Sequence, residues 1–224
     1  MHLRILPVAA LLAVLAACAG LPSDGGVAEQ GPRPPEALLA DGDAALERNE
    51  LPEAARAYRQ AAEASDDEAV AEQATRAAFD HFQMREASLA AERWLVLNPT
   101  SEEARRYAGV TALALHRLDV AEQHFAELLG SAYLSPAAGF LALLPVVSDH
   151  GTAPDVTELF RRLVARHATV AEGHYALGSA ALSSENFSLA LDAARRATEI
   201  APYWIPAGML LARALATSGD EEAG

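Results

Sequence analysis

The sequence predicts an all-α protein, a right-handed superhelical solenoid built from antiparallel helix pairs. Two observations support this fold class. From residue 36 onward apolar residues recur three and four positions apart, alanine is abundant, and the β-branched runs that favour strands are absent. Small residues also return in register, with anchor positions at 54, 87, 121, 156 and 190, which are spaced by 33, 34, 35 and 34 residues. Such a period indicates stacked helical repeats.

The first segment of the chain, residues 1–17, is expected to be a lipoprotein signal peptide. A short basic start is followed by an apolar run over residues 5–17. This run is shorter than the roughly 20 apolar residues that span a bilayer, and it is typical of a secretory signal. An ordinary signal peptide with an incidental cysteine is the alternative interpretation.

The residues Leu15-Ala16-Ala17-Cys18 resemble the bacterial lipobox. The resemblance implies that the Cys18 thiol is acylated, that the signal is removed before it, and that several acyl chains then anchor the protein firmly. Ala19, in place of an aspartate, implies the outer membrane, with the protein on its periplasmic face. Cys18 is also the chain's only cysteine, so packing rather than an intrachain disulfide must stabilise the fold.

Residues 18–35 are predicted to be the lipidated cysteine and a flexible tether. The stretch after Cys18 is crowded with glycine and proline and lacks apolar periodicity. The repeats are expected to fill residues 36–224. This division makes the soluble part a body that stands away from the membrane.

The charge balance excludes some partners. The chain has 17 basic residues, all of them arginine, against 31 acidic residues, and its net charge is -14. Nucleic acids and anionic lipid surfaces both attract basic patches, so neither is an expected ligand of the repeats.

The repeats follow a recognisable order of residues. A small residue is followed by an alanine where two helices touch, then by an aromatic residue that fills the gap to the next repeat. A proline after the second helix ends it. This order resembles the tetratricopeptide repeat. The matches, taken along the chain, are Gly42, Ala54 and Tyr58; Ala87, Ala91 and Pro99; Gly109, Ala121 and Phe125; Val156 and Phe160; and Leu177-Gly178, Ala190, Ala194 and Pro202. An irregular helical bundle is the alternative.

Three stretches depart from the regular repeat or connect its units. Residues 66–68, an acidic run, are expected to be a solvated loop between repeats. In the fourth repeat Pro145 should kink the first helix, because proline lacks a backbone donor, and residues 148–155 are expected to form a polar turn. At the end, a helix over 205–216 is expected to be followed by a turn and a new helix start in "GDEEA", 219–223. About five and a half repeats result, and more repeats are expected after residue 224.

No motif in the sequence predicts catalysis, a cofactor or a metal. The histidines of the expected mature chain, at 81, 116, 124, 150, 167 and 174, form no i, i+4 pair of the kind that binds zinc on a helix. There is no glycine-rich phosphate loop and no G-x-S-x-G nucleophile elbow. The chain is therefore predicted not to be an enzyme.

The expected working surface is the groove lined by the first helix of each pair. Mapping by position places acidic, basic and polar side chains there: Asp43, Glu47, Glu72, Arg76, Asp80, Glu103, Arg106, Tyr175 and Ser179. This mixed acidic face would suit a polar or basic segment of a protein partner. An ordinary solvated surface is the equal alternative.

Three segments resemble a particular group of tetratricopeptide lipoproteins, namely residues 70–83, 91–99 and 139–149. Members of that group are outer-membrane adaptors that bind a periplasmic carboxyl-terminal processing protease and bring it substrates, which include peptidoglycan hydrolases. The resemblance implies a binding role with no catalytic residues. Two alternatives stay open: an assembly or piloting lipoprotein for a secretin or the β-barrel insertion machinery, and the non-catalytic part of a larger enzyme.

Overall fold

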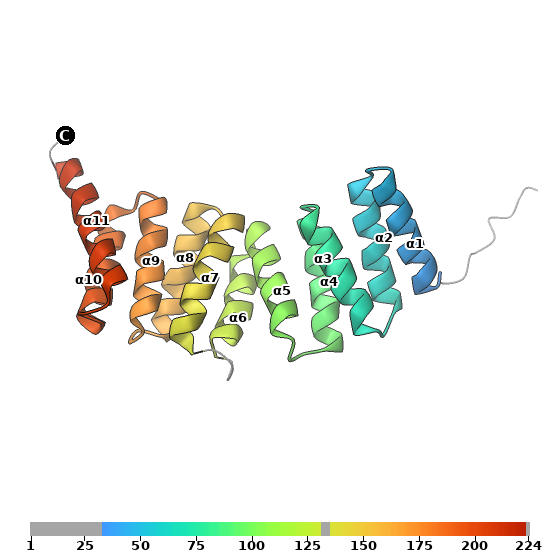
Figure 1. The fold of residues 1–224 in the computed structure, drawn as a ribbon, viewed down its shortest axis with the longest axis horizontal. Coiled ribbons are helices and arrows are strands. Elements are labelled where there is room, and N and C mark those ends of the chain that lie inside the picture. The colour runs from blue at the N-terminus through green and yellow to red at the C-terminus, as the bar shows by residue number, and fades with distance from the viewer. Residues whose placement is uncertain (1–32, 131–134, 223–224) are drawn as a thin grey trace, which may run out of the picture. The chain divides into compact units, whose positions relative to one another are not determined.

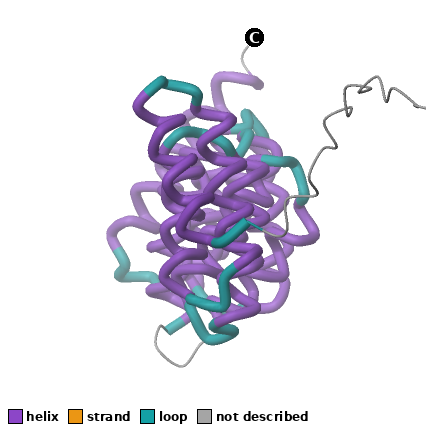
Figure 2. The backbone as a smooth tube through the Cα atoms, turned by 90° about the vertical axis from the view of Figure 1, so that its right-hand side faces the viewer, coloured by secondary structure: helices purple, strands orange, loops and turns teal. Residues whose placement is uncertain are grey.

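The computed structural model describes residues 33–130 and 135–222, and these ranges form α-helices and loops without a strand (Figures 1 and 2). The all-α prediction is confirmed. The helices are α1 Pro35–Glu47, α2 Leu51–Ala64, α3 Glu68–Asp80, α4 Met84–Leu97, α5 Glu102–Ala114, α6 Leu118–Leu129, α7 Pro136–His150, α8 Ala153–Arg166, α9 Ala171–Ser183, α10 Phe187–Ile200 and α11 Ile205–Glu222. The expected signal peptide, Cys18 and nearly all of the tether lie outside the described residues.

Consecutive helices stand next to each other in chain order and pack in pairs (Figure 1). The pairs α1–α2, α3–α4, α5–α6 and α9–α10 have the closest backbones. The helices α2, α4, α8 and α10 also pack extensively against the next odd-numbered helix. Helix α6 differs, because its backbone contact with α7 is small and it also packs against α8. This arrangement is the expected solenoid of helix pairs. No helix among the described residues is long and apolar enough to cross a membrane.

The predicted repeat register is confirmed. Every anchor position is the fourth residue of an even-numbered helix, and each is at most 2% exposed: Ala54, Ala87, Ala121, Val156 and Ala190. The small residue of the preceding helix faces this second helix. A Cβ added at Gly42 would lie 2.8 Å from the Tyr58 ring, and one at Gly109 would lie 2.8 Å from the Phe125 ring. Glycine at these positions therefore lets the two helices approach closely.

The turns inside four of the helix pairs share a left-handed residue that the sequence did not reveal. Asn49, Phe82, His116 and Glu185 all have φ of 57° or 58°, and each lies two residues after an odd-numbered helix. The next residue donates back into the helix, as Arg117 N does to the Ala112 carbonyl at 2.8 Å. This is the Schellman helix ending, in which glycine is the usual residue. None of these four is glycine, and only Asn49 is of a type that commonly adopts this conformation, so the sequence marked the other three helix ends poorly.

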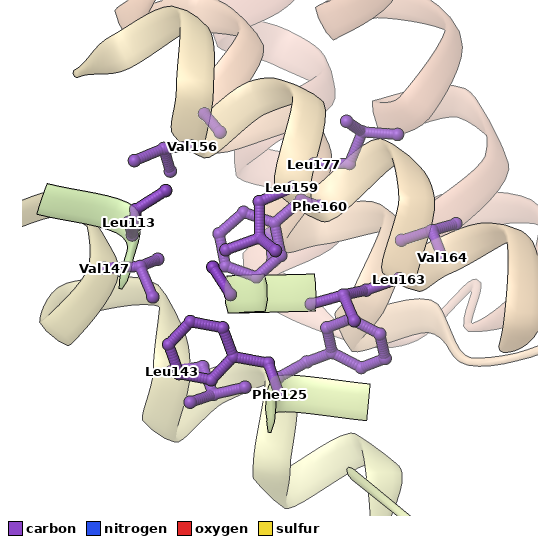
Figure 3. Close-up of a cluster of buried hydrophobic side chains, with 14 of the residues drawn as sticks. Leu113, Phe125, Leu143, Val147, Val156, Leu159, Phe160, Leu163, Val164 and Leu177 are labelled. Atoms are coloured by element: carbon purple, nitrogen blue, oxygen red, sulfur yellow. The ribbon is translucent and has the colours of Figure 1, made fainter. Parts of the chain in front are cut away.

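The fourth pair, α7–α8, is built differently from the others. Its backbones lie close at few points, and α7 packs on α5 and α9 instead. The reason is the size of the side chains between the helices, where alanine and glycine are replaced by a layer of large residues (Figure 3). Phe140, Leu143 and Val147 of α7 meet this layer together with Leu159 and Phe160 of α8. Large side chains hold the two helices apart.

The expected polar turn over residues 148–155 is wrong. Helix α7 continues through Pro145 to His150, and α8 begins at Ala153, so only Gly151 and Thr152 connect them. The Thr152 hydroxyl accepts a hydrogen bond from the Asp155 N–H at 3.3 Å and caps α8, which allows so short a connection. Pro145 lies inside α7 without ending it.

The acidic run 66–68 is only partly a loop. Asp67 caps α3 by accepting from the Ala69 N–H at 2.9 Å, and Glu68 is the first residue of that helix. The Glu68 carboxylate accepts hydrogen bonds from Trp94 Nε1 at 2.7 Å and from Asn98 Nδ2 at 2.9 Å. These bonds lower the pKa of Glu68. Glu68 thus ties α3 to the end of α4.

The turn expected in "GDEEA" is also wrong, because α11 runs on through Gly219 to Glu222. Glutamate favours helices, and one interior glycine costs only about 1 kcal/mol relative to alanine. The first part of the helix, expected over 205–216, is confirmed. Its inner face buries Ala207, Leu210 and Ala214 against the preceding pair, while Met209 is 68% exposed.

Candidate binding face

We use the name odd-helix face for the surface carried by α1, α3, α5, α7 and α9. All the groove residues predicted from the sequence lie on these helices. Asp43 and Glu47 lie on α1; Glu72, Arg76 and Asp80 on α3; Glu103 and Arg106 on α5; and Tyr175 and Ser179 on α9. None of the predicted groove residues lies on α7.

The structure brings four of the predicted residues together across α3 and α5. Arg76 forms ion pairs with Glu72 at 2.8 Å and with Glu103 at 2.9 Å, and Arg106 reaches the same Glu103 oxygen at 3.5 Å. The Arg106 guanidinium also lies 5.7 Å from the centre of the Tyr107 ring. Exposed pairs of this kind add little stability. Their consequence is that the carboxylate of Glu103 already has two cationic partners.

The other predicted residues do not join this cluster. Asp43 accepts a hydrogen bond from the Tyr58 hydroxyl at 2.6 Å, and burial together with that bond raises the pKa of Tyr58. The Tyr175 ring packs edge-on against Trp204, with 5.1 Å between ring centres. Glu47 and Asp80 are exposed, and Ser179 is partly exposed. Asp43 therefore contacts the second helix of its own pair, whereas Tyr175 contacts the connection between α10 and α11.

A pocket of about 390 Å³ lies where α5 and α7 meet the end of α6. Its polar side is formed by Glu102, Glu103 and Arg106 of α5. Its apolar lining is contributed by Leu128, Leu129, Gly139, Ala142, Leu143 and Val146. We call this the α5–α7 pocket. Two of the predicted residues, Glu103 and Arg106, lie at this pocket.

Sequence reasoning missed the apolar lining because leucine, valine and alanine on a helix look like core. One signal was available: α7 has no charged residue from Pro136 to Ser148. A helix that is apolar all round is normally buried. Here Leu141 is 42% exposed, and Ala138 and Ala142 are exposed as well. Helix α7 thus presents apolar surface beside the pocket.

One oxygen at the pocket has no partner. Glu102 is the first residue of α5, and its Oε1 atom is buried without a hydrogen-bond partner among the described residues. The preceding Ser101 caps the helix through its own hydroxyl, which accepts from the Ala104 N–H at 3.2 Å. Neither arginine that contacts Glu103 is paired with Glu102.

A carboxylate with a strongly lowered pKa, that of Glu158, lies on the even-numbered helix α8. Hydrogen bonds from Arg161 and then Arg162, at 2.6 and 2.7 Å, lower the pKa of Glu158 to about 2. Arg162 also reaches Asp119 of α6 at 2.6 Å, so the group links α6 to α8. The described residues contain no cluster of histidine, cysteine, aspartate or glutamate that could hold a metal ion.

Comparison with protein-family models and with curated proteins found no match. Among solved structures, the chain is similar to the MamA protein at 16% identity, covering 74% of this chain and 91% of that one, with a TM-score of 0.43. It is also similar to YrrB, described as a TPR protein with an unusual peptide-binding site, at 16% identity, 76% and 88% coverage and a TM-score of 0.40. A third match is the structure described as the TPR2AB-domain:pHSP90-complex of yeast Sti1, at 14% identity, 84% and 86% coverage and a TM-score of 0.34.

Proposed function

We propose that this chain is a protein-binding scaffold without catalytic activity, and that its partner binds the odd-helix face around the α5–α7 pocket. The observation that carries the proposal is the apolar surface of α7. Leu141 and Ala142 face solvent on a helix that has no charged residue until its last turn.

Among residues 33–130 and 135–222, no core cluster includes this exposed surface of α7. Large side chains on the other side of α7 fill the layer toward α8, so Leu141 and Ala142 stabilise no core. Exposed apolar surface next to a concave pocket with a few charged groups is typical of a protein interaction site. Glu103, which lines this pocket, is held in place by its ion pair with Arg76.

Substitution of Ala142 by arginine tests this site. The longer arginine side chain should fill the mouth of the pocket and prevent binding. Because Ala142 is exposed, its substitution should leave the fold stable. The protein and the variant are immobilised, incubated with periplasmic and outer-membrane extract, and the captured proteins are quantified by mass spectrometry. We expect at least one partner to be captured by the wild type and depleted about tenfold or more by Ala142→Arg.

Ala165→Arg is the matched control, because Ala165 is an exposed alanine on α8, away from the pocket. It should capture the partner as the wild type does. A set of captured proteins that is the same for all three chains would contradict the proposal. Recovery of a carboxyl-terminal processing protease would support the adaptor role, which we propose on the resemblance of residues 70–83, 91–99 and 139–149.

We also propose that Cys18 carries the lipid anchor that holds the scaffold at the outer membrane, facing the periplasm. The support is the Leu15-Ala16-Ala17-Cys18 sequence and the glycine- and proline-rich stretch after it. Cys18→Ser should abolish labelling by radioactive palmitate, because an oxygen nucleophile does not form the thioether. Labelling of the variant at the wild-type level would refute the anchor.

A further inference from the structure

We infer that the α5–α7 pocket binds an apolar side chain of a partner segment that also carries a lysine or arginine, and that this cation pairs with Glu102. The inference rests on the proposed function, since it specifies the chemistry of the segment that the odd-helix face binds. It concerns a pocket of about 390 Å³, which is within the usual range of ligand sites.

The lining decides the first half of the inference. Leu128, Leu129, Leu143 and Val146 line the pocket. Gly139 also lines it, and the Leu129 side chain packs so close to Gly139 that an added Cβ would lie 2.6 Å from it. A leucine or phenylalanine side chain placed there would leave water and contact these apolar groups, which favours binding. Polar side chains would lose hydrogen bonds to water without replacement.

Glu102 decides the second half. Its Oε1 atom is buried and unpartnered, which leaves an unmet cost of desolvation. The arginines nearby are already engaged. Arg76 and Arg106 pair with Glu103, and Arg105 pairs with Glu127 and donates to the Pro99 carbonyl at 2.6 Å. No cation among the described residues pairs with Glu102, and the residue as a whole is partly exposed, so a cation brought by the partner can reach its carboxylate.

Other occupants fit the pocket less well. An acidic segment would approach Glu102 and Glu103 with only Arg106 at the pocket to attract it. A second copy of this chain carries a net charge of -14, so two copies repel each other. The unpaired carboxylate and the net charge both favour a basic partner with an apolar anchor residue.

The test uses fluorescein-labelled nonapeptides with a central phenylalanine flanked by lysine, glutamine or glutamate, and the full-length protein, with binding followed by fluorescence anisotropy. We expect the lysine peptide to bind, the glutamine peptide to bind roughly tenfold more weakly and the glutamate peptide weakest of all. Replacement of the central phenylalanine by serine should abolish binding of the lysine peptide.

Three variants assign the effect to Glu102. Glu102→Gln should weaken the lysine peptide roughly tenfold and leave the glutamine peptide unchanged. Glu102→Lys should reverse the order, so that the glutamate peptide binds best. Glu53→Gln, an exposed glutamate of α2, is the matched control and should bind as the wild type does. Cooperative thermal melts above the assay temperature show that all four proteins are folded.

The inference is overturned if the three peptides bind the wild type equally, or if Glu102→Gln leaves the preference for lysine intact. Its failure is distinguishable from failure of the proposed function. Loss of partner capture in Ala142→Arg, together with peptides that show no charge preference, overturns only the inference. Unchanged capture in Ala142→Arg overturns the proposed site itself.

Discussion

Replacement of Ala121 by glutamate should destabilise the protein by roughly 3 to 5 kcal/mol, the range typical of an uncompensated buried charge. Ala121 is the fourth residue of α6, is 0% exposed, and belongs to the largest buried cluster. The glutamate side chain would enter a seam between helices that is lined by apolar side chains such as Val110, Leu113 and Phe125. Overpacking and burial of the carboxylate therefore act in the same direction.

Urea unfolding followed by circular dichroism measures this effect. The midpoint should fall sharply for Ala121→Glu, and the variant should be partly unfolded at room temperature if the total stability is in the usual range of about 5 to 15 kcal/mol. Ala165→Glu is the control, since this alanine of α8 is exposed. Its midpoint should stay close to that of the wild type. Equal midpoints for the two variants would contradict the register of the repeats.

The repeat register could be predicted from the sequence because it depends on the size of single residues. Gly42 and Gly109 meet the rings of Tyr58 and Phe125 at distances that permit no Cβ, so sequence and packing correspond directly. The ends of helices were less predictable. Phe82 and Glu185 adopt the left-handed conformation that glycine normally marks, and Glu68 looked like a loop residue because three acidic residues stand in a row.

The candidate site was predicted only in its charged part. Residues such as Arg76 and Glu103 follow from their position on the first helix of each pair, and the structure brings them together. The apolar part depends on where α7 lies, and that is set by the summed volume of side chains between α7 and α8. No short sequence pattern reports such a volume. Leu143 belongs to the core and also lines the pocket, and a sequence pattern does not distinguish such a residue from one that is core alone.

Substitution of Phe160 tests whether the side-chain volume between α7 and α8 sets the position of α7. Phe160 is fully buried on α8 and its ring lies 6.3 Å from the ring of Phe140 on α7, in the layer that separates the two helices (Figure 3). Phe160→Ala should cost about 3 to 5 kcal/mol, because it removes a large buried group and leaves a cavity. Phe160→Leu fills most of the space and should cost clearly less.

The same substitution should also affect the pocket, because Leu143 belongs both to this layer and to the pocket lining. With Phe160 truncated, α7 can settle toward α8, and the α5–α7 pocket then changes shape. We expect Phe160→Ala, at a temperature where it is still folded, to lose affinity for the lysine peptide, whereas Phe160→Leu retains most of it. Thermal melts and anisotropy titrations of both variants measure the two effects. Wild-type binding by folded Phe160→Ala would mean that the large side chains between α7 and α8 do not set the position of α7.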